Sequence, residues 1–234
     1  ETLKGDAAEL PILAELANLS ANELYRYVGE LRARDLVQRR SRWRAVLPHA
    51  IANRLAHQAL DRIPTNLIVE AFVPKSRERL LKSFSRRLSY LHDCEPAKKI
   101  AEDWLGDPNW LASPARLTEL GIALFHNVAP LVPKHALNTI EAAALGKDGI
   151  AFISPDAPNR WRWAALLRAL AYEPDLFDRA AFLLAHFCAA EPENYKHNST
   201  QSAFKELFHL YLSGTHALSE QRLALIRHLL DSDN

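Results

Sequence analysis

Apolar residues recur with a helical period over the first 35 positions of the chain. This spacing predicts one helix over 6–18 and a second over 21–35. Between them, Ser20 is followed three positions later by Glu23, the spacing of a capping box that starts a helix. The apolar positions that define the two helices are Leu10, Leu13, Leu16, Leu24, Val28 and Leu31.

Two short runs of strand character follow the second helix. Residues 36–40 and 43–47 are joined by the polar pair Ser41-Arg42, which predicts a β-hairpin. Helix, turn, helix and hairpin in this order are typical of a winged helix. We therefore expect a winged-helix domain over 1–62, which includes a further helix that starts after Pro48.

The remainder, 63–234, has the pattern of helices in series separated by prolines. Because no fixed repeat period is found, we expect an irregular α-helical array, similar to helix-pair repeats, and a fold that is mainly α. Residues 63–74 are interpreted as a connecting stretch, and Ile150–Ile153 as a short extended piece. The helices are expected over 49–61, 76–92, 96–105, 114–126, 134–145, 158–171, 175–189, 200–212 and 218–231.

A tryptophan pair lies in one of these helices. Trp161 and Trp163 are two positions apart, so their side chains point in well-separated directions on a helix. We expect one to be buried in the helix stack and the other to be partly exposed.

Composition is that of an ordinary globular protein, with 48% hydrophobic and 24% charged residues in 234. Apolar runs are far shorter than the roughly 20 residues that cross a bilayer, and no signal peptide opens the chain. We therefore expect a cytoplasmic protein with no membrane partner, and we expect Cys94 and Cys188 to be reduced thiols. Because the chain opens on Glu1 instead of methionine, we interpret it as a mature product or an excised piece.

Charge is uneven although the formal net charge is only +1. Seven basic residues stand against three acidic ones over 23–44, and eight stand against three over 75–99. Each stretch fits either a surface that faces an anion or an ordinary solvated helix face.

No motif of a catalytic centre is present. The sequence has no HExxH, GxSxG, GxGxxG or P-loop pattern, and its histidines and cysteines lack zinc-ligand spacing. We therefore expect a protein that is not an enzyme, with no catalytic residues, no metal site and no cofactor of its own.

A winged helix also suggests DNA binding, with the helix over 21–35 in the major groove. The wing would then contact phosphates through Arg39, Arg40, Arg42 and Arg44. The sequence pI of about 8.1 is lower than a nucleic-acid-binding domain usually has, so we expect nucleic-acid binding to be weak.

Residues 46–56, VLPHAIANRLA, resemble the end of the winged-helix domain in STAND-type NTPases, a class of signal-transducing ATPases. The resemblance implies that His49 corresponds to the family's histidine, which contacts the β-phosphate of bound ADP and holds the closed state. Pro48 and Ala50 stand where the family has Met and Asp, so the acidic partner is lost. The competing interpretation is that His49 is simply a polar residue at a helix start.

Two later segments, 80–105 and 207–230, resemble the helical region that follows the NTPase module in bacterial STAND proteins. The resemblance implies a non-catalytic regulatory and sensor segment, possessing a winged helix and the beginning of a helical arm, in a signalling ATPase of the antiviral defence type. ADP or ATP would be the cofactor of the full-length protein. The partners would be the NTPase core of the same polypeptide and a protein trigger or oligomer partner. The alternatives are a winged-helix transcriptional regulator with a helical effector or dimerisation domain, and a plain helical scaffold.

Overall fold

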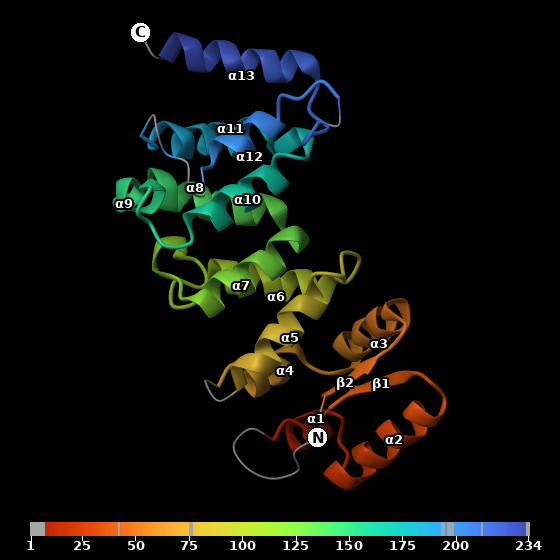
Figure 1. Ribbon diagram of the computed structural model, residues 1–234. Coiled ribbons are helices and arrows are strands. Elements are labelled where there is room, and N and C mark those ends of the chain that lie inside the picture. Colours follow the sequence, from red (N-terminus) through yellow and green to blue (C-terminus); the bar gives the residue numbers. More distant parts are fainter. Residues whose placement is uncertain are drawn as a thin grey trace. The chain divides into compact units, whose positions relative to one another are not determined.

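The computed structural model describes residues 8–41, 43–74, 77–192, 195, 199–211 and 213–232, and it is mainly helical (Figure 1). The chain divides into two compact units, Glu1–Asp103 with Glu119–Leu131, and Trp104–Thr118 with Val132–Asn234. The expected fold class is confirmed, since a winged-helix-like start is followed by a helical array. The sequence-based boundary after residue 62 falls inside the first unit, because the next helices pack together with the winged helix.

The winged-helix-like start has two helices, a two-stranded antiparallel sheet and a third helix. Ser20 and Glu23 form the expected capping box, with Ser20 Oγ accepting from the Glu23 N–H at 3.2 Å. The hairpin register pairs Val37 with Val46 and Arg39 with Arg44. These elements are α1 (Leu10–Leu16), α2 (Ala21–Ala33), β1 (Val37–Arg40), β2 (Trp43–Val46) and α3 (His49–Arg62).

A helix occupies most of the stretch that the sequence indicated as a connection. This helix, α4 (Thr65–Phe72), lies between the two prolines that suggested the connection. Pro64 is its N-cap residue, so one proline marks the helix start instead of interrupting a helix. Its buried residues are four positions apart, and the Phe72 ring meets Phe84 at 5.0 Å between centroids.

The first unit is completed by α5, most of α6, and α7. Helix α5 packs against α7, and Asn127 Nδ2 donates to Ser85 Oγ at 2.9 Å between them. The helix expected over 114–126 instead begins at Glu119, after a separate 3₁₀ turn at Pro114–Arg116. The bounds are α5 (Glu78–Leu88), α6 (Glu95–Gly106), α7 (Glu119–Val128) and the 3₁₀ turn η3 (Ala129–Leu131).

The second unit is a stack of helices around an apolar core. Helix α10 packs against α11, which also contacts α8, α12 and α13. The prediction of an extended piece over Ile150–Ile153 was wrong. The segment forms the short helix α9, with Phe152 buried and Ile150 exposed. The elements are α8 (Pro133–Leu145), α9 (Gly149–Ile153), α10 (Arg160–Leu170), α11 (Pro174–Ala189), α12 (Gln201–Glu206) and α13 (Ser219–Ser232). Its fully buried large side chains include Leu137, Ile140, Trp163, Leu167, Phe177 and Phe187.

The expectation for the tryptophan pair is confirmed. Trp163 is 2% exposed and lies against Phe152, whereas Trp161 is 52% exposed. The side of the helix that carries Trp163 therefore faces the core, and the side that carries Trp161 faces solvent.

We predict that Trp163→Ala lowers the free energy of unfolding by about 3–5 kcal/mol, because it leaves a cavity in the core. Trp161→Ala is the matched control and should change it by no more than about 1 kcal/mol. Urea titration followed by circular dichroism measures both values. Equal losses for the two variants would contradict this assignment of the core.

Candidate functional site

The wing gathers arginines at its tip. Arg39 Nε and Arg44 Nη1 both donate to the Ser41 carbonyl, at 3.1 and 3.0 Å, and Arg44 Nη1 also donates to the Trp43 carbonyl. Arg40 is exposed on β1, and Arg42 lies outside the described residues. Three of the four arginines that the sequence assigned to the wing are therefore placed on its strands, two of them folded back on the turn.

His49 is the first residue of α3 and follows the wing directly. Pro48 is the N-cap residue in extended conformation, and it offers no side-chain cap. The first N–H groups of a helix have no partner within the helix and carry the positive end of its dipole. The exposed His49 side chain thus lies beside backbone groups that favour an anion.

A cavity of about 610 Å³ opens beside His49 in the first unit. Its walls come from β2, α3, α4 and α5. The cavity therefore lies between the winged-helix-like start and the helices that follow it. Its described lining residues are Arg44, Ala45, Val46, His49, Ala52, Leu55, Phe72, Leu80, Ser83, Phe84, Arg86, Arg87 and Tyr90. None of these lining residues is a carboxylate, and three of them are arginines.

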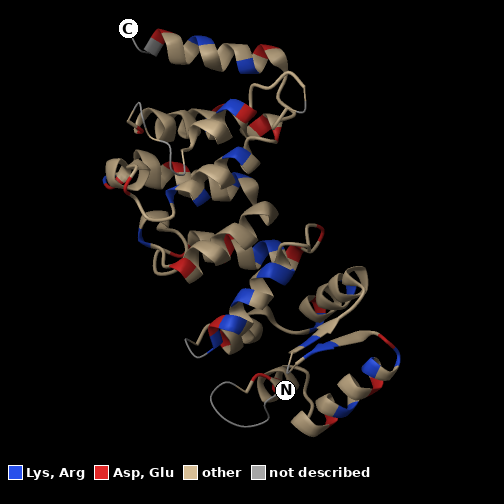
Figure 2. Ribbon diagram, viewed as in Figure 1, with Lys and Arg blue, Asp and Glu red and all other residues tan. Residues whose placement is uncertain are grey.

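Helix α5 supplies the two arginines that sequence reasoning did not assign to a site. Arg86 is exposed, while Arg87 is half-buried and donates through Nη1 to Asn53 Oδ1 of α3. The Arg87 guanidinium also lies 5.9 Å from the Tyr90 ring centroid. Figure 2 shows lysines and arginines recurring on the wing strands and along α5. The basic excess over 75–99 was the sequence signal for these residues, but not for their place beside His49.

A third arginine of α5 holds the helix to the start of the chain and to the wing. Arg79 Nε donates to Glu9 Oε1 at 2.6 Å, and the guanidinium lies 4.0 Å from the ring centroid of Trp43. Arg79 and Arg87 therefore connect α5 to the winged helix, and Arg86 lies between them in sequence.

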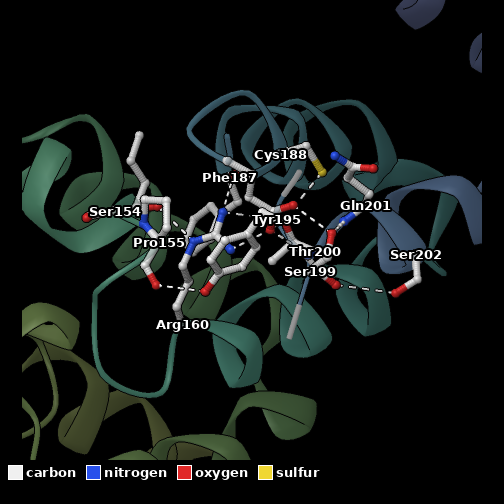
Figure 3. A network of polar contacts seen from close by, with 12 residues as sticks. Ser154, Pro155, Arg160, Phe187, Cys188, Tyr195, Ser199, Thr200, Gln201 and Ser202 are labelled. Atoms are coloured by element: carbon white, nitrogen blue, oxygen red, sulfur yellow. Dashed lines mark hydrogen bonds and ion pairs between the residues drawn. The ribbon is translucent and has the colours of Figure 1, made fainter. Parts of the chain in front are cut away.

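The second unit contains a buried polar network around Arg160 (Figure 3). Arg160 Nη1 pairs with Glu191 Oε1 at 2.6 Å, and the two side chains are 3% and 0% exposed. Arg160 Nε donates to the Ile153 carbonyl, and Nη2 donates to Phe187 O and Thr200 Oγ1. Because each guanidinium nitrogen has a partner inside the protein, this network fastens the segment before α12 to α10 and to the end of α11.

Glu191 is held in its ionised form by this network. Desolvation by itself would raise its pKa, but hydrogen bonds from Ser199, from Thr200 and from Arg160 together hold the pKa below 4.5, its ordinary value. A carboxylate with a lowered pKa stabilises the fold above its unfolded-state pKa, and this stabilisation is lost as the pH falls through the folded-state pKa.

The two cysteines are free thiols without the surroundings of a nucleophile. Burial raises the pKa of the Cys94 thiol, and burial also raises that of Cys188 although Thr200 hydrogen-bonds to its sulfur. A raised pKa disfavours the reactive thiolate.

Among the described residues, no group of three or more His, Cys, Asp and Glu side chains is arranged to hold a metal ion. No helix in the described part of the chain is both long and apolar enough to span a membrane.

No family model, curated protein or solved structure matches this chain.

We predict that Glu191→Gln lowers the free energy of unfolding at pH 7 by about 3–5 kcal/mol, because it leaves Arg160 as an unpaired buried charge. The loss should shrink as the pH falls from 4.5, where Glu191 of the unfolded chain takes up a proton, through the lower pKa of the folded state, below which Glu191 is neutral in the folded wild type too. Urea titrations of both proteins across this pH range test the prediction.

Glu141→Gln is the control, because Glu141 pairs with Arg179 on the surface and should contribute no more than about 1 kcal/mol. A difference between wild type and Glu191→Gln that stays constant with pH would contradict the ionised state assigned to Glu191.

Proposed function

We propose that the chain is a non-catalytic regulatory segment of a STAND-type signalling ATPase, in which the winged helix contacts the phosphates of bound ADP. The supporting observation is the position of His49, exposed at the start of α3 on a cavity whose charged described lining residues are all basic. The ADP would belong to an NTPase core in the same polypeptide. A contact made only in the closed, ADP-bound state would stabilise that state over the open, oligomer-forming one.

The proposal gives the second unit the task of binding a protein trigger or partner. Apolar side chains on α13 support this role: Leu223, Ile226 and Leu230 are 46%, 38% and 65% exposed. These residues recur three and four positions apart, so they form one stripe along the helix. Leu225 on the same helix is buried against the rest of the unit, which leaves the stripe available to a partner.

A DNA-binding regulator is the second candidate, and the wing is the observation that favours it. Arg39 and Arg40 are exposed on β1, where a winged helix contacts the phosphate backbone. On α2, however, Arg26 is engaged with Glu30, and Glu23 is exposed, so the helix that would enter the groove also presents acids. Acids on that helix oppose the phosphates of DNA.

The reading frame that contains residues 1–234 separates the two candidates. A P-loop and a Walker-B aspartate in the same polypeptide would support the signalling ATPase. A polypeptide that lacks both would exclude it.

In the polypeptide with its NTPase core, we predict that His49→Ala weakens ADP retention and shifts the protein towards its oligomeric state. A charge-assisted hydrogen bond to phosphate contributes about 1.5–3 kcal/mol, so its loss changes the closed-to-open ratio by roughly 10- to 150-fold. Bound nucleotide after gel filtration and the oligomer fraction by light scattering measure the effect.

The control is His57→Ala on the same helix, because His57 contacts Asp61 and does not line the cavity. If His49→Ala instead lowers the melting temperature of residues 1–234 by many degrees and leaves ADP retention unchanged, His49 is a helix-start residue and the proposal is wrong.

For duplex DNA, we predict weak binding with a steep loss of affinity as salt rises, because contacts would run through arginines to phosphates. Fluorescence anisotropy should show that Arg39→Gln with Arg40→Gln reduces this binding, while Arg116→Gln with Lys147→Gln in the second unit has less effect. Sequence-specific nanomolar binding at physiological salt, lost in the wing variant, would favour the transcriptional regulator.

A further inference from the structure

The cavity beside His49 combines basic groups with an accessible apolar wall. Among the charged residues that are described in its lining, all are Arg or His. Leu55 and Tyr90 on the wall are 47% and 51% exposed, and Phe84 is half-buried. Apolar side chains left open to water beside basic groups form a surface that an amphipathic anion would cover favourably.

Arg86 is the donor best placed to take an anion. It is exposed, and its guanidinium has no ion pair or hydrogen bond within the part of the chain that the structure describes. Arg87 uses one nitrogen on Asn53, which fixes the guanidinium, and its side chain also lines the cavity. An arginine presents five donors in a rigid fork that suits the several oxygens of a phosphate, and Arg86 and Arg87 both line the cavity.

The apolar wall indicates the other half of the ligand. Phe72 and Phe84 lie edge to face, and Tyr90 lies under the Arg87 guanidinium. A flat aromatic group stacks on such rings or on the guanidinium plane. The cavity volume of about 610 Å³ is that of a small-molecule site, which ordinarily spans about 300–1,000 Å³.

We propose that this cavity binds a small aromatic phosphate ester, with the phosphate on Arg86 and Arg87 and the ring against Leu55, Phe84 and Tyr90. The inference deepens the proposed function, on which it rests for the phosphate-facing role of His49. It adds that the first unit holds the ligand with its own residues, through arginines of α5. Mononucleotides and aryl phosphates both combine a phosphate ester with an aromatic ring.

Isothermal titration of the 234-residue chain at low ionic strength tests the proposal, with AMP and naphthyl phosphate as the probes. Both should bind saturably. Adenosine and naphthol lack the phosphate, and inorganic phosphate lacks the aromatic ring, so each should bind at least about tenfold more weakly. Tighter binding of AMP than of naphthyl phosphate would identify the ligand as a nucleotide, and the reverse order would identify it as an aryl phosphate.

Arg86→Gln should lower the binding affinity for both esters by about tenfold or more, because it removes a charge-assisted hydrogen bond. Arg86 is exposed, so the variant should keep the wild-type circular dichroism spectrum and melting temperature. Arg54→Gln is the matched control, since Arg54 is exposed on α3 of the same unit and does not line the cavity. It should leave both affinities unchanged.

The proposal is overturned if neither ester binds saturably up to about 10 mM. It is also overturned if inorganic phosphate binds as tightly as the esters, or if Arg86→Gln and Arg54→Gln have equal effects. If the esters fail to bind while His49→Ala still lowers ADP retention in the longer polypeptide, only this inference falls. If the esters bind and ADP retention is unaffected by His49→Ala, the ligand assigned to the cavity is supported and the proposed function is wrong.

Discussion

Arg79 connects α5 to the wing and to the start of the chain, and the candidate site depends on that connection. The guanidinium pairs with Glu9 and lies over the Trp43 ring, while Arg87, two turns along the same helix, bonds to Asn53 of α3. These contacts place α5 along one side of the cavity. Arg86 lies on the same helix, so it lines the cavity as well. None of the described lining residues is a carboxylate that could pair with it. Like charges repel when they are close, and a bound anion relieves that cost.

The second unit pairs one of its arginines in the interior. Arg160 and Glu191 neutralise each other in the interior, and Arg179 pairs with Glu141 at the surface. Its large buried side chains form a helical core, and three of its exposed apolar residues, Leu223, Ile226 and Leu230, lie on α13. These features support the proposed division of labour, in which the first unit would bind a small anion and the second would offer a surface to a protein partner.

Local patterns were sufficient to predict most helices and the hairpin, because capping and periodicity act over a few residues. Ser20 with Glu23 is the clearest case. The failures occurred where tertiary packing decided the outcome. Helix α4 forms between two prolines because Ile68 and Phe72 find a core, and the apolar run at Ile150–Ile153 is too short to distinguish strand from helix. His49 was found by resemblance, but Arg86 and Arg87 became site residues only when folding brought α5 beside α3.

The central claim is that arginines of α5, rather than those of the wing tip, take the anion. Arginine Nε–H resonances in nuclear magnetic resonance spectra, assigned by single substitutions and followed during an AMP titration, measure this directly. The account predicts saturable shifts of Arg86 and Arg87, together with the backbone amides at the start of α3 near His49. Shifts confined to Arg39 and Arg40, or an absence of saturable shifts in the α5 arginines, would contradict it.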